Sequence, residues 1–149
     1  MAVVLPPNST GQTVDTDTTV AGKERAVSVP PSGGAFNLYH LPAAATQATV
    51  TQAAGAAGVK NVATGLSFNS TTVGTAQTVI SVSLRDGATG AGTILWSTQF
   101  IQPVNNVFAM AVVLPHIKGT AATAMTLEFS AAGAAATLQS VSLQGYTTA

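Results

Sequence analysis

The chain has no cysteine and few charged side chains. The lack of cysteine excludes disulfides and thiolate metal sites, and nothing in cysteine usage indicates an oxidising compartment. Asp, Glu, Lys and Arg make up 7% of the 149 residues, against roughly 25% in ordinary globular domains. Nucleic-acid binding needs clustered basic side chains that displace counterions. The basic residues here are spread along the chain, which argues against a nucleic-acid partner. They are Lys23, Arg25, Lys60, Arg85 and Lys118.

Long apolar runs are also absent. The longest, VFAMAVVLP at 107–115, is well short of the roughly 20 residues that span a bilayer. The opening MAVVLPPNST has no basic region, and its apolar run stops at Pro6, so it does not match a secretory signal. We therefore expect a protein that is made in the cytoplasm and has no membrane partner.

What the chain does have is small and apolar residues. It is 46% hydrophobic with a formal net charge of zero, which is too apolar and too poor in charge for a disordered chain. Its length suits one domain with a core of its own. A neutral, charge-poor surface promotes association, so we expect a homo-oligomer, either a dimer or a trimer.

Residues 1–35 have the composition of an extended N-terminal arm. Prolines and glycines punctuate this range, and residues 9–22 are polar without apolar periodicity. Within it, ERAVSVP at 24–30 alternates well enough to form one short strand. Two interpretations stay open: a loose terminus, or an arm that becomes ordered on a partner.

From residue 36 onward the dominant hydrophobic period is two, as in half-buried strands. Ile80, Val82 and Leu84, for example, alternate with polar side chains. Short strands with regularly spaced turn signals indicate a sandwich or barrel. We predict an all-β fold in which residues 36–149 form a single jelly-roll-like β-sandwich; counting the arm, about eight strands are expected. The expected strands are 24–30, 46–52, 59–70, 80–85, 94–100, 106–115, 125–130 and 140–144.

Three segments carry finer predictions. Ile94, Trp96 and Phe100 share one parity, which predicts that Trp96 lies in the core. The segment 106–115 is apolar on both faces, as expected for a strand that is covered on both sides. The alanine-rich segment 41–58 could form a helix, but its threonines and glycines favour a strand plus a loop.

The glycine-rich stretch DGATGAG at 86–92 raises the possibility of a phosphate-binding loop. A P-loop needs a lysine and a hydroxyl residue after its last glycine, followed by a helix. Here Gly92 is followed by TILWSTQF, which alternates like a strand and contains no lysine. Asp86-Gly87 after an alternating strand is a turn signal, so the loop is predicted only to reverse the chain.

The remaining polar residues form no recognisable catalytic or metal-binding pattern. Arg85 is expected at a solvated strand end or, alternatively, in a salt bridge between subunits. His40 and His116 lack the spacing of metal ligands and are expected to be structural or interface residues. No pair of carboxylates is favoured by spacing. The acidic residues are Asp15, Asp17, Glu24, Asp86 and Glu128. We expect no catalytic residues, no cofactor and no metal.

Carbohydrate recognition would need several exposed planar rings. Most aromatic residues share parity with aliphatic residues on the expected strands, so they are predicted to belong to the core. Trp96 and Tyr146 are the alternative candidates for surface platforms.

Three phrases carry a resemblance to a known class. NLYHLPAAATQATVTQAAG (37–55), VSLRDGATGAGTILWS (82–97) and AMTLEFSAAGAAATLQSVSLQGY (124–146) resemble small β-rich proteins encoded among bacteriophage virion genes. The resemblance implies a structural component on the capsid exterior, such as a decoration or cement protein that bridges subunits of the major capsid protein. The alternative is a tail- or fibre-associated adhesin that binds host surface glycans.

Overall fold

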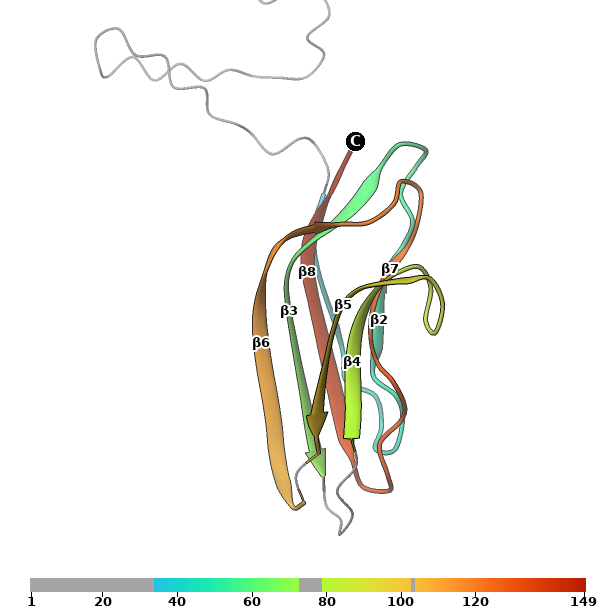
Figure 1. Ribbon diagram of the computed structural model, residues 1–149. Coiled ribbons are helices and arrows are strands. Elements are labelled where there is room, and N and C mark those ends of the chain that lie inside the picture. Colours follow the sequence, from blue (N-terminus) through green and yellow to red (C-terminus); the bar gives the residue numbers. More distant parts are fainter. Residues whose placement is uncertain (1–33, 73–78, 103) are drawn as a thin grey trace, which may run out of the picture. The chain divides into compact units, whose positions relative to one another are not determined.

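Figure 1 shows two antiparallel four-stranded sheets that face each other. The computed structural model describes residues 34–72, 79–102 and 104–149, and these ranges contain no helix. They therefore hold no helix long and apolar enough to cross a membrane. The strands are β1 (Ala35–His40), β2 (Thr49–Gln52), β3 (Lys60–Thr72), β4 (Val79–Asp86), β5 (Thr93–Ile101), β6 (Asn106–Lys118), β7 (Met125–Phe129) and β8 (Leu138–Thr148).

The strand pairs are nested around the hairpin of β4 and β5. Sheet A has the order β1-β8-β3-β6, and sheet B has the order β2-β7-β4-β5. The first strand thus pairs with the last, β2 with β7, β3 with β6 and β4 with β5, all antiparallel. The predicted all-β sandwich is confirmed; the described residues form eight strands, seven of them at expected positions, while the eighth expected strand, 24–30, lies outside these residues.

The core lies between the two sheets and follows the predicted alternation. Apart from Ala48, which directly precedes β2, its fully buried members come from β3, β4, β7 and β8, the strands at the centre of each sheet. The inward-facing positions of 80–85, 125–130 and 140–144 are buried as the period of two predicts. They are Ile80, Val82, Leu84, Met125, Leu127, Phe129, Val141 and Leu143.

The N-terminal part of the sandwich differs from the sequence-based assignment. The first 33 residues of the expected arm, including its strand at 24–30, lie outside the described residues. The segment 35–40 is not among the expected strands, yet it forms β1 at the edge of sheet A. In 41–58 the favoured strand and loop are confirmed, because β2 occupies Thr49–Gln52 and no helix forms there.

A β-bulge in β5 corrects the predicted parity of Ile94 and Trp96. Leu84 pairs with Trp96, whereas the next residue, Arg85, pairs with Ile94, so Leu95 is an extra residue. Trp96 therefore faces inward beside Leu84, half-buried against the core. Ile94 lies on the outer face and is 50% exposed.

The prediction that 106–115 is covered on both sides is wrong for the single chain. β6 is the edge strand of sheet A, next to β3 alone among the described strands. Its outer side chains are exposed, and Val113 is 93% exposed. The strand that is buried at every position is β7.

Candidate functional site

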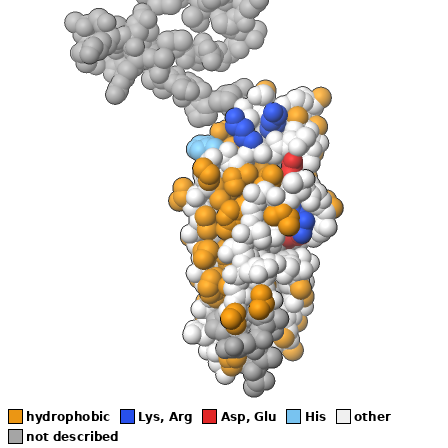
Figure 2. All heavy atoms as spheres, in the orientation of Figure 1, with side chains coloured by type: hydrophobic (Ala, Val, Ile, Leu, Met, Phe, Trp, Pro, Cys, Tyr) orange, Lys and Arg blue, Asp and Glu red, His pale blue; other side chains and the backbone are white. Residues whose placement is uncertain are grey.

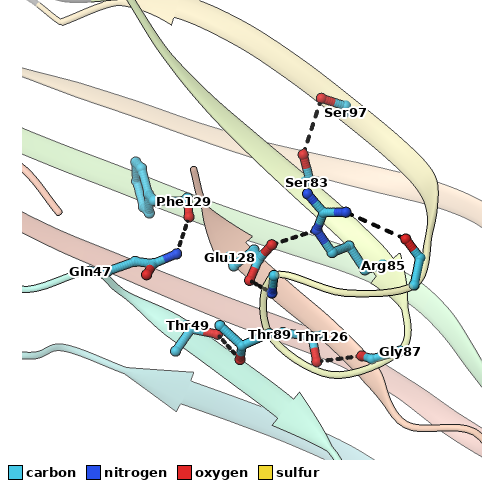
Figure 3. Close-up of polar contacts among 12 residues, drawn as sticks. Gln47, Thr49, Ser83, Arg85, Gly87, Thr89, Ser97, Thr126, Glu128 and Phe129 are labelled. Atoms are coloured by element: carbon cyan, nitrogen blue, oxygen red, sulfur yellow. Dashed lines mark hydrogen bonds and ion pairs between the residues drawn. The ribbon is translucent and has the colours of Figure 1, made fainter. Parts of the chain in front are cut away.

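The loop from Gly87 to Gly92 folds back over the outer face of sheet B (Figure 3). Gly87, Gly90 and Gly92 all have positive φ, which glycine adopts without steric cost. A Cβ on Gly92 would lie 2.1 Å from the carbonyl oxygen of Asp86, so the backbone passes itself too closely for any side chain. The loop reverses the chain, as predicted.

A backbone N–H group of this loop that could have bound an anion is already hydrogen-bonded to a carboxylate of the same chain. The Gly90 N–H donates to Oε2 of Glu128 at 2.8 Å. Oε1 of Glu128 accepts from Nε of Arg85, and Nη1 of Arg85 lies 3.5 Å from the Gly92 carbonyl oxygen. The ion pair thus contacts the loop at Gly90, through Glu128, and at its C-terminal residue Gly92, through Arg85.

The ion pair is largely shielded from solvent. Glu128 is 3% exposed and the Arg85 side chain 22% exposed. Arg85 lies at the end of β4, as expected, but its guanidinium is paired with Glu128 of its own chain and is only partly exposed rather than fully solvated. The alternative of a salt bridge between subunits stays a prediction. Within the chain, the pair bonds to the loop through the Gly90 N–H and the Gly92 carbonyl.

Hydroxyl groups fasten the same loop to β7 and β2. Oγ1 of Thr126 donates to the Gly87 carbonyl oxygen at 2.7 Å, and the hydroxyls of Thr49 and Thr89 lie 3.2 Å apart. The loop thereby covers the outer face of β7, which explains why Thr126 and Glu128 are buried although they point away from the core.

The other predicted polar residues also form local structural contacts. Asp86 accepts hydrogen bonds from the backbone N–H and the hydroxyl of Thr120, away from Glu128. Nδ1 of His40 accepts from the Thr49 N–H at 3.2 Å, which connects β1 to β2. His116 and the Tyr146 hydroxyl are 3.2 Å apart. Asp15, Asp17 and Glu24 lie outside the described residues.

No group of three metal-ligating side chains occurs in the part of the chain that the structure describes. The arrangement around Arg85 and Glu128 is a closed hydrogen-bonded network in which each of these polar groups already has a partner on its own chain.

The most prominent exposed feature is the β6 edge, which we define as residues 107–113. Figure 2 shows a stripe of hydrophobic side chains along the left of the view, over the position of β6 in Figure 1. Met110 is 37% exposed and Val107 57% exposed, and Ala109 and Ala111 are also exposed. Sequence analysis found the apolar run but assigned it to the interior, since hydropathy does not distinguish an edge strand from a central one.

The β6 edge continues into an uncharged outer face of sheet A. The pairing register places small or polar side chains on the outer face of β3 and β8 beside it. These residues are Gly65, Ser67, Asn69, Thr71, Ser140, Ser142 and Gln144. The large hydrophobic Leu138, 42% exposed, shares this face at the start of β8. The described charged residues of sheet A, Lys60 and Lys118, lie at one end beyond the bulge at Ala63–Gly65. Between the bulge and the opposite end of the sheet, the described residues of this face are therefore uncharged.

Exposed aromatic rings are few on the described surface. Trp96 packs against the core with its ring centroid 6.4 Å from that of Phe68, and Tyr146 contacts His116. Tyr39 on β1 is 62% exposed. The prediction that most aromatic residues belong to the core is confirmed for Phe68, Phe100 and Phe129.

Comparisons of the chain with protein-family models, with curated proteins and with solved structures found no match.

Proposed function

We propose that the chain is a structural protein of a bacteriophage particle, a capsid decoration or cement protein that bridges and stabilises subunits of the major capsid protein. The observation that carries the proposal is the uncharged outer face of sheet A with the apolar β6 edge beside it. Covering this surface avoids the large cost of burying charges and removes the apolar β6 side chains from water, so it suits a protein whose task is to bury area against neighbours.

The strand order supports the same proposal. Eight strands paired in a nested series around one hairpin fit a jelly roll, an architecture found in viral capsid proteins and in lectins. The fold alone does not select a function. The fold contributes a sandwich of two hydrogen-bonded sheets, which holds the exposed side chains of each face in fixed relative positions.

The mechanical role follows from interface area. A cement protein resists separation of shell subunits because parting them would re-expose the surfaces that it covers. In this proposal the arm, residues 1–35, adds area by lying over a neighbouring shell subunit or by pairing with a sheet edge. No bound cofactor and no catalytic step are needed.

Locating the protein in the virus particle tests the proposal. Antibodies raised against the purified chain should label the shell faces of intact particles, and particles lacking the chain should lose DNA at a lower temperature. Labelling at a single vertex would contradict the cement role and support a tail position. Absence of the chain from purified particles would overturn any virion role.

The exposed ring of Tyr39 favours the alternative, a tail- or fibre-associated adhesin that binds host glycans. Glycan-binding faces usually combine several planar rings with polar groups. A glycan array probed with the wild-type chain and with Tyr39→Ala would support the adhesin only if binding occurs and the substitution removes it.

A further inference from the structure

We propose that the β6 edge pairs with the β6 edge of a second copy of this chain, antiparallel and across a two-fold axis at Met110. The two four-stranded copies of sheet A would then form one continuous sheet of eight strands. The inference goes beyond the proposed function and does not depend on it, because it concerns the protein by itself.

The first argument is that the β6 edge has none of the features that normally protect a sheet edge. Natural edge strands are shielded by charged residues, prolines or bulges. Residues 107–113 contain none of these, whereas the following segment has Pro115, a register shift and Lys118. The features that protect an edge from pairing therefore begin directly after the apolar stretch. This points to a pairing site limited to the residues between Asn106 and Leu114.

The second argument is that the stretch VFAMAVV is complementary to itself. In an antiparallel pair centred on Met110, position 107 faces position 113 of the second copy, 108 faces 112, and 109 faces 111. The outer-face pairs are then Val with Val and Ala with Ala, and the inner-face pairs are Phe with Val and Met with Met. Paired residues match in polarity, and no like charges meet.

A two-fold arrangement also gives a closed assembly. Pairing of β6 with β1, the other edge of sheet A, would join unlike surfaces and generate a ring or an open filament. When β6 pairs with β6 of a second copy, neither chain has a free β6 edge left, so the assembly ends at the dimer. The same pairing also places Val113, the most exposed large hydrophobic residue of the described surface, beside Val107 of the second copy.

Cysteine cross-linking tests the register directly, because the full-length chain contains no cysteine. Met110→Cys places one thiol opposite its counterpart. An equimolar mixture of Ala109→Cys and Ala111→Cys places a thiol of one chain opposite a thiol of the other at the neighbouring position. Adjacent antiparallel pairs alternate between close and wide spacing, so mild oxidation should yield a disulfide-linked dimer in at least one of these two experiments. Gln144→Cys, exposed on β8 away from the edge, is the control and should remain a single chain.

Charge substitution tests the same contact without oxidation. Ala109 and Ala111 are exposed, so charged side chains there leave the core intact. Ala111→Lys and Ala109→Glu should each raise the dimer dissociation constant by about tenfold or more, because each brings like charges together near the two-fold axis. An equimolar mixture of the two variants should recover dimerisation, since the introduced lysine of one copy would then face the introduced glutamate of the other. Circular dichroism of each variant checks that the sandwich is folded.

Each possible outcome either supports the proposed dimer or rejects it. A wild-type dimer in sedimentation velocity at micromolar concentration, weakened by each charge variant and recovered by their mixture, supports the proposal. A wild-type monomer, a dimer insensitive to positions 109 and 111, or open-ended growth into fibrils overturns it. A monomer with a β6 edge protected from hydrogen exchange would identify the chain's own arm as the occupant and would equally reject the second copy. None of these results depends on where the protein lies in a virus particle.

Discussion

The rings of Phe100 and Phe108 stack face to face, with centroids 4.2 Å apart and an interplanar angle of 7°. Phe100 belongs to β5 of sheet B, and Phe108 to β6 of sheet A. Phe68 lies 5.8 Å from Phe100 and 6.1 Å from Phe108. This group of rings closes the interior at the side of the sandwich where β6 is the edge strand, so the position of β6 depends on packing across the core as well as on its pairing with β3.

Phe100→Ala should lower the free energy of unfolding by about 3 to 5 kcal/mol, as large-to-small core substitutions do. The loss arises from the removed contacts with Phe68, Phe108 and Phe129 and from the cavity that remains. Urea denaturation measures it. Tyr39→Ala is the control: its ring is 62% exposed, so a change of only about 0.5 kcal/mol or less is expected. Equal effects of the two substitutions would contradict the assigned core.

Glu128→Ala should destabilise the chain by about 2 to 4 kcal/mol, because it leaves a partly buried guanidinium and the Gly90 N–H without their acceptor. The loop from Gly87 to Gly92 should become a site of proteolysis. Arg85→Ala should have a comparable effect. A double-mutant cycle measures the coupling between the two residues; additive losses would show that the pair does not hold the loop as a unit.

Gly92→Ala and Gly90→Ala form a matched pair within one loop. Both positions have positive φ, +83° and +71°. A Cβ at Gly90 meets nothing within 4 Å, whereas one at Gly92 overlaps the Asp86 carbonyl. Thermal unfolding should therefore show a loss of about 1 to 2 kcal/mol for Gly90→Ala, from backbone strain alone, and a clearly larger loss for Gly92→Ala. The reverse order would contradict the loop conformation.

Trp96→Ala should cost about 2 to 3 kcal/mol, below the range for a fully buried ring, because Trp96 is half-buried against the core. Trp96 is the sole tryptophan of the chain, so its fluorescence in the wild type reports unfolding at this position, and melting of the variant is followed by circular dichroism. A variant with unchanged melting that loses glycan binding would instead support the adhesin alternative.

The period-two pattern predicts most of the described strands because burial on one face imposes an alternation that side-chain polarity reveals. β7 is the clearest case, since Met125, Leu127 and Phe129 all face the core. The pattern does not predict β1. The segment AFNLYH is short and directly follows the glycines near the end of the arm, and its alternating residues Phe36, Leu38 and His40 are only half-buried.

Other features depend on relations that one segment does not contain. The bulge at Leu95 arises from the pairing of β5 with β4, and it reverses the face of Ile94 without any change in polarity pattern. The ion pair of Arg85 and Glu128 joins residues 43 positions apart in the sequence. The glycines of the loop predict that the chain reverses, but not that the loop folds back onto Glu128. The edge position of β6 follows from strand order alone, which local hydropathy does not encode.

The position of β8 determines when sheet A can form during synthesis. β8 is made last of the described strands, yet it lies between β1 and β3 and pairs with both. Until Tyr146 has left the ribosome, β1 lacks its complete partner among the described strands, and the pairing of β3 with β8 is completed only when Thr148 has also emerged. The hairpin of β4 and β5 can close early, because few residues separate its strands, whereas the pairing of β1 with β8 joins the two ends of the sandwich and is intrinsically slow. Folding of the sandwich is therefore expected to finish only after β8 has been synthesised, with the apolar β6 segment exposed to other nascent chains in the interval.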